Sequence, residues 1–153
     1  MILSAMQAQA EAILKGNATF AGCPVVLVDK GGIAARIDEA LAAAGTAILI
    51  APPSIRFTAN GGQGPVSTDG GVRMIVQVIE PPGMGRPAGT PSALDLAETA
   101  GWLLHSANHP ERADFTPLGL DELAAQPDPD TLIVQLVLVA TASLSPPATQ
   151  TQG

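Results

Sequence analysis

The chain has 153 residues and a formal net charge of −7, and hydrophobic residues make up 46% of it. This composition allows a substantial buried core and excludes an acidic disordered chain. The seven Lys and Arg residues stand singly, and the sequence holds one Trp, three Phe and no Tyr. We expect no specific nucleic-acid binding, because phosphate contacts need clustered positive charge and single strands need aromatic stacking surfaces.

A single cysteine, Cys23, excludes an internal disulfide and a metal site built from several thiolates. It precedes an apolar run, so we expect a buried, unreactive thiol in a reducing compartment. The apolar runs 40–52 and 132–144 fall short of the roughly 20 residues that a membrane helix needs. The N-terminal segment lacks the basic start of a signal peptide. We therefore expect no association with a membrane.

The first third of the chain predicts two helices and two strands in alternation. Apolar side chains recur with helical spacing over residues 2–15, and the β-branched run 25–28 is typical of a strand. A second helix follows, with Asp29 as its expected N-cap and Gly45 as its end. The apolar run 46–51 is too short and too β-branched for a helix, so we expect a buried strand there.

The middle of the chain predicts a long β-hairpin. Residues 55–58 and 72–80 alternate apolar and polar side chains, and a glycine-rich stretch with turn chemistry separates them. The outer part, about residues 53–71, buries little within its own subunit, and isolated two-stranded hairpins are marginal in water. We therefore expect this arm to project and dock on a neighbouring subunit or on another protein of the same assembly; the alternative is a mobile surface loop. The expected apolar contacts are Ile55, Phe57 and Val66.

A third helix is predicted to run to about His105, with the Thr-Pro pair at residues 90–91 as N-cap and first turn. Helical spacing predicts one buried face, formed by Ala93, Leu96, Ala97, Ala100, Leu103 and Leu104. Residues 106–130 predict a mostly polar connection, with a short strand near Phe115 and a helical turn at 120–124.

The run 132–142 predicts the strongest strand of the chain, buried on both faces, because Gln135 is its only strongly polar residue. Together the elements predict an α+β fold in the order α-β-α-β-β-α-β, with one small, mostly antiparallel sheet and helices packed on one side. One domain is expected over residues 1–144, followed by a Pro-, Thr- and Gln-rich tail over 145–153. The predicted core includes Ile37, Leu41, Ile48, Ile50, Val76, Val78, Leu96, Leu103, Val134 and Leu136.

No combination of residues in the sequence points strongly to catalysis. His105 and His109 stand four apart, as in a zinc-binding helix, but the Glu of that motif is absent and Pro110 ends the helix. The turn 29–32 lies between a strand and a helix, where backbone amides can bind an anion. We therefore expect no enzyme activity, no cofactor and no metal. The alternative is a small-ligand binding or catalytic domain that uses the 29–32 turn.

Neighbouring passages of the sequence are similar to a pattern in small tail proteins of bacteriophages. The strand 72–80 ends in an acidic residue and is followed by a Pro-Gly loop, and the stretch 90–98 then leads to Trp102-Leu103-Leu104-His105. The helix at residues 2–15 and the final strand agree with the same arrangement. In this order of elements the chain resembles the tail terminator, or tail completion, proteins.

This resemblance implies a structural virion protein without catalytic residues. Tail terminators form a ring, usually a hexamer, that caps the tail tube and joins it to the head. The implied partners are further copies of the chain and the tail tube, sheath or neck proteins. The implied location is the tail or neck of a particle assembled in the host cytoplasm. Within the same class, the alternative is another head-tail connector, such as a neck or head-completion protein.

Overall fold

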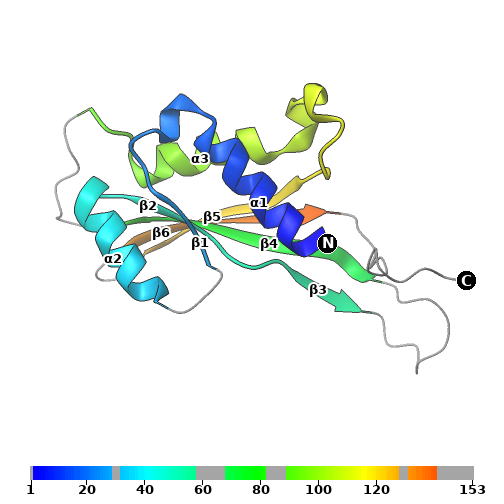
Figure 1. Ribbon diagram of the computed structural model, residues 1–153, viewed down its shortest axis with the longest axis horizontal. Helices are drawn as coiled ribbons and strands as arrows, with labels where there is room; N and C mark the ends of the chain where they lie inside the picture. The colour runs from blue at the N-terminus through cyan, green and yellow to red at the C-terminus, as the bar shows by residue number, and fades with distance from the viewer. Residues whose placement is uncertain (1, 29–31, 58–67, 82–88, 128–130, 141–153) are drawn as a thin grey trace, which may run out of the picture.

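The computed structural model describes residues 2–28, 32–57, 68–81, 89–127 and 131–140 (Figure 1). Within these ranges the helices are α1 (Ile2–Lys15), α2 (Ile33–Ala44) and α3 (Ala93–Leu104), with short 3-10 helices η1 (Ala18–Phe20), η2 (Ser106–Asn108) and η3 (Pro110–Arg112). The strands are β1 (Val25–Leu27), β2 (Ala47–Ile50), β3 (Ser54–Phe57), β4 (Thr68–Glu80), β5 (Gly119–Pro127) and β6 (Leu132–Ala140). No helix in the described ranges is long and apolar enough to cross a bilayer.

Strand β4 is the centre of the sheet. The strand order is β1-β2-β4-β6-β5, and β3 pairs with β4 beyond the end of β2. Among the described strands, only β1 and β2 run parallel to each other. Pro52 and Pro53 separate β2 from β3, because proline cannot donate to a strand ladder. The expected α+β class, the mostly antiparallel sheet and the pairing of the two hairpin strands are confirmed.

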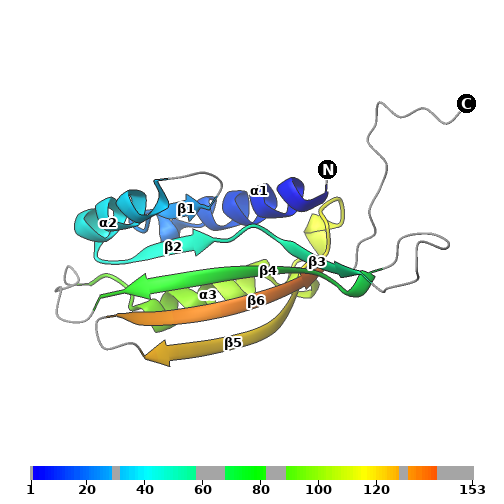
Figure 2. The same ribbon diagram turned by 90° about the horizontal axis from the view of Figure 1, so that it is seen from below.

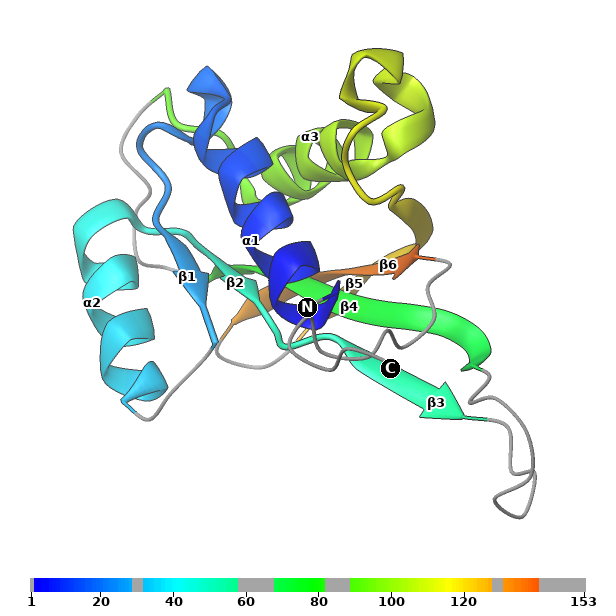
Figure 3. The same cartoon turned by 45° about the vertical axis from the view of Figure 1, so that its right-hand side comes forward.

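Helices α1 and α3 lie side by side on one face of the sheet (Figure 3). Figure 2 views the sheet from its other face, with α3 behind strands β4 and β6. All six residues predicted for the inner face of α3 are buried, as are Met6, Ala10 and Leu14 of α1. Apolar spacing predicted both faces because a helix returns to the same side every three or four residues. These helices pack on Ile48, Ile50, Val72, Met74, Val76, Val78, Val134, Leu136 and Leu138.

Helix α2 packs on the opposite face of the sheet, which differs from the expected placement of all helices on one side. Successive strand residues point to opposite faces, and Ala47 and Leu49 of β2 form a second cluster with Ala40 of α2. The predicted core residues Ile37 and Leu41 belong to this smaller cluster and are only partly buried. The other eight predicted core residues are buried.

Two helix caps differ from the predicted ones, and one predicted helix end is confirmed. The side chain of Ser92 accepts a backbone N–H of the first turn of α3 at 3.2 Å, so Ser92 and not the pair at 90–91 is the N-cap. Gly32, with φ +80°, precedes α2, and the predicted cap Asp29 lies outside the described residues. At the end of α2, Gly45 adopts φ +76° and donates its N–H to the carbonyl four residues earlier.

Strand β5 is the largest departure from prediction. The helical turn predicted at 120–124 is wrong, because β5 pairs with β6, and the short strand predicted near Phe115 is absent. The register shifts by one residue after Leu120, which is a β-bulge. The bulge brings Leu120 and Leu123, three residues apart, to the same face, where both approach Gly101 of α3. A spacing of three is also that of a helical face, so the apolar spacing alone does not distinguish this bulged strand from a helical turn.

The face of the sheet opposite α3 is only partly buried, so the prediction that the final strand is buried on both faces is wrong. On that face Gln135 and Val139 of β6 are partly exposed, and Ile75 of β4 is 37% exposed. Polar pairs occupy the same face: the Gln77 amide donates to the side-chain oxygen of Gln135 at 3.3 Å. Solvent therefore reaches this side of the strand.

Candidate functional site

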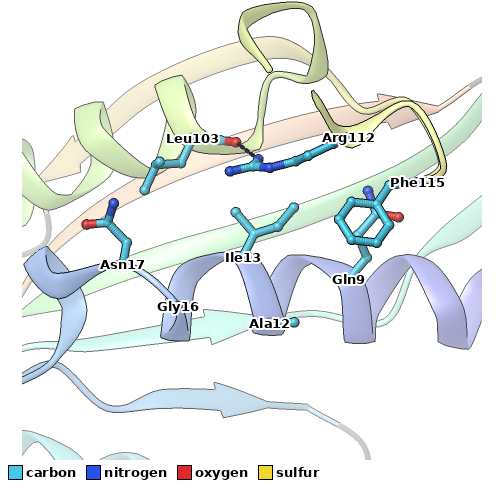
Figure 4. A pocket seen from close by; sticks show the side chains of 8 residues that line it. All are labelled: Gln9, Ala12, Ile13, Gly16, Asn17, Leu103, Arg112 and Phe115. Carbon is cyan, nitrogen blue, oxygen red and sulfur yellow. Dashed lines mark hydrogen bonds between the residues drawn. The ribbon is translucent and has the colours of Figure 1, made fainter. Parts of the chain in front are cut away.

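A pocket of about 330 Å³ lies between α1 and the segment that connects α3 to β5 (Figure 4). This segment turns through η2 and η3 and returns to lie against α1. Both apolar and polar side chains line the pocket. The lining residues are Gln9, Ala12, Ile13, Gly16, Asn17, Leu103, Arg112 and Phe115.

Hydrogen bonds hold the two walls of this pocket in place. The side-chain amide of Gln9 donates to the Thr116 carbonyl at 2.8 Å, and its oxygen accepts the Thr116 N–H at 3.1 Å. The Arg112 guanidinium donates to the Leu103 carbonyl at 2.5 Å, close to the end of α3. Each bond joins a side chain to backbone, so the connecting segment has a defined position on the helices.

The two histidines noted in the sequence serve separate structural contacts. The Nδ1 of His105 accepts the Leu120 N–H at 3.0 Å, which fixes the start of β5 against the end of α3. His109 is buried, with Nε2 at 3.3 Å from the Trp102 carbonyl and its ring edge-on to the Trp102 ring at 4.6 Å between centroids. Each ring therefore makes at least one structural contact within the chain.

The described residues hold no group of three His, Cys, Asp or Glu side chains that could bind a metal ion. His109 Nδ1 instead lies 3.2 Å from the carboxylate of Glu111. The pKa of Glu111 is lowered, first by its own backbone N–H and then by His109. Glu111 is exposed and therefore remains a solvated carboxylate at neutral pH.

We expect Cys23 to react slowly with iodoacetamide in the folded protein. Burial raises the pKa of its thiol more than the hydrogen bond from the Thr46 hydroxyl, at 3.5 Å, lowers it. The stability linked to the neutral thiol is thus present below the unfolded pKa of 9.0 and lost as the pH rises through the folded value. Alkylation near neutral pH, followed by mass spectrometry, should be much slower in native than in urea-unfolded protein. Equal rates would contradict a buried thiol.

The residues predicted to contact a partner are only partly described by the structure. Ile55 is partly buried and packs against the main core of its own chain. Val66 and the side chain of Phe57 lie outside the described residues, as do most residues of the turn 29–32, of which Gly32 alone is described. The docking role of the hairpin and the anion site at the turn therefore stay predictions.

The fold matches a chain in a solved virus-like particle. The matching structure is that of the virion of a native gene transfer agent particle, with a TM-score of 0.51 and 18% sequence identity. The match covers 90% of this chain and 93% of that chain. At this identity the likeness shows a shared fold over almost the whole of both chains. No protein-family model matches the sequence, and no curated protein sequence matches it.

Proposed function

We propose that the protein is a structural component of a phage-like particle. The observation that carries this proposal is the fold shared almost end to end with a chain of a gene transfer agent virion. Within that class, the order of elements that resembles tail terminators favours a ring that caps the tail tube and joins it to the head or neck. A non-enzymatic role is consistent with the histidines and the cysteine, which serve packing and local hydrogen bonds.

Unpaired strand edges support assembly into a ring. Strand β5 ends the sheet on one side, β1 ends it on the other, and β3 has a partner only in β4 among the described strands. Open edges attract further strands, and a closed ring of subunits covers them without leaving a growing end. Leu123 of β5, which is 42% exposed, adds apolar surface beside one of these edges.

The protein should form a closed ring when mixed with tail tube protein of its own particle. Light scattering measures the mass of the purified chain, alone and with tube protein. Electron microscopy of the mixture shows whether rings form at the tube ends. We expect a mass close to six chains of 15.4 kDa each and rings at tube ends. A mass of one chain under both conditions, with bare tube ends, would contradict the terminator role. Rings bound to head particles but not to tubes would favour a neck or head-completion protein.

A deletion variant tests whether the hairpin arm contributes to assembly. Removing residues 60–70, which include the first three residues of β4, and joining the strands by a tight turn should keep the pairing of Ile55 with Val72 and the rest of the sheet. Assembly should be weakened if the arm docks on a neighbouring subunit or on the tail tube. Unchanged assembly would leave only the mobile-loop interpretation. The small-ligand alternative predicts instead that the wild-type chain stays monomeric and that inorganic phosphate shifts the backbone signals of residues 29–32.

A further inference from the structure

The pocket between α1 and the 103–115 segment contains the positive charge of Arg112, which acts on the exposed Glu111 carboxylate without forming an ion pair with it. Arg112 is partly buried, and among the described residues its guanidinium donates a hydrogen bond to the Leu103 carbonyl. A guanidinium carries five N–H donors, and no carboxylate of the described residues lies within 4.0 Å of this one. The adjacent carboxylate, Glu111, is directed to His109. Donors of Arg112 therefore remain for an anion from outside.

The pocket also has an apolar part, which includes an exposed ring. Phe115 is 49% exposed although it lines the pocket, while Ile13 of α1 and Leu103 of α3 line it from opposite sides (Figure 4). An aromatic ring left half in water beside an arginine is typical of the anchor residues of protein interfaces. An apolar group that entered here would cover Phe115 while a carboxylate beside it reached Arg112.

The walls of the pocket are positioned before any partner arrives. The paired hydrogen bonds of Gln9 with Thr116 hold the segment that carries Phe115 against α1. The bond to Leu103 holds Arg112 over the opening. A site whose side chains are already ordered loses less conformational entropy on binding.

We propose that this pocket docks a segment of another protein subunit that presents an apolar side chain next to a carboxylate. The apolar side chain would pack on Phe115 and Ile13, and the carboxylate would accept two N–H groups of the Arg112 fork. This inference rests on the proposed function in one respect, namely that the occupant is a neighbouring protein in an assembly. A chain with a net charge of −7 and seven Lys and Arg residues offers an acidic segment few cationic contacts, which makes Arg112 a selective one.

The test uses two short peptides that differ only in charge. Acetyl-Ala-Phe-Glu-Ala-amide is titrated into the full-length protein, and acetyl-Ala-Phe-Gln-Ala-amide is the neutral control. Side-chain N–H signals of Arg112 and Gln9, observed by NMR, should shift saturably with the acidic peptide. The neutral peptide should bind about tenfold more weakly, the value of one hydrogen bond to a charged group. Equal affinities, or no shift at Arg112, would overturn the proposal, as would binding of hexanoate without binding of the peptide.

Two exposed alanines of α1 provide matched variants that keep the helix. Ala12→Glu places a carboxylate in the pocket wall beside Arg112, whereas Ala8→Glu places the same group one turn earlier, outside the lining. Glu is a good helix former, so both variants should fold. Ala12→Glu should abolish peptide binding and Ala8→Glu should preserve it; the same loss in both would overturn the assignment. If the protein forms rings but does not bind the peptide, the docking role of the pocket is refuted and the proposed function is not.

Discussion

Replacing Leu136 with Ala should lower the free energy of unfolding by about 2–5 kcal/mol. Leu136 is fully buried in the middle of β6, between Val76 of β4 and Leu123 of β5, and it packs beneath Gly101 of α3. Truncation leaves a cavity there, because strands on both sides and a helix above keep the backbone from collapsing.

Urea denaturation measures this effect as a lower midpoint with an unchanged slope. Leu94→Ala is the control, since Leu94 lies on the outer face of α3 and is 50% exposed. Its expected change is within about 0.5 kcal/mol. If both substitutions changed stability equally, the assignment of the inner face of α3 and its packing on β6 would be wrong.

Replacing Gly71 with Ala should lower the free energy of unfolding by about 2–5 kcal/mol through strain and overpacking together. Gly71 has φ +78°, a conformation that side chains disfavour, and a Cβ there would lie 2.5 Å from the backbone oxygen of Ala140. A backbone oxygen in a paired strand cannot move aside as a flexible side chain does. The substitution should therefore disturb the pairing of β4 with β6 at that end of the sheet.

A substitution at Gly89 distinguishes backbone strain from overpacking. This glycine has φ +85°, but no described atom lies within 4 Å of the Cβ it would gain. Gly89→Ala should therefore show only the conformational penalty, about 1–2 kcal/mol. Thermal or urea unfolding of both variants gives the comparison. A Gly71→Ala protein no less stable than the Gly89→Ala protein would contradict the close approach of β4 to β6.

The helices and most strands were predictable from the sequence because each has a strong local signal. The apolar period of α1 and α3, the glycine that ends α2 and the alternation in β4 all depend on neighbouring residues only. Strand β5 was not predictable in this way, because its bulge gives two leucines a helix-like spacing. The sequence also did not indicate which side of the sheet α2 covers, because both faces of β2 are apolar.

The candidate pocket was not predictable, because its walls come from distant parts of the chain. Gln9 and Thr116 are 107 positions apart, and neither belongs to a recognisable motif. In the sequence, Gln7 and Gln9 are only two of several polar residues in an amphipathic N-terminal helix. The structure explains both side chains: Gln7 donates to the carbonyl of Val28, just after β1, and to that of Ile50 in β2, while Gln9 holds the connecting segment.

The pairing of the first helix with late parts of the chain has a consequence for biosynthesis. While the ribosome is still making the second half, β4 lacks its neighbour β6, and α1 lacks α3 and the segment bound by Gln9. Contacts of such long sequence separation form slowly and late. Nascent chains thus present unfinished apolar surface until translation is nearly complete. A chain that ends before β6 lacks the strand that pairs with both β4 and β5, so it leaves the apolar faces of those strands and of α3 without their partner.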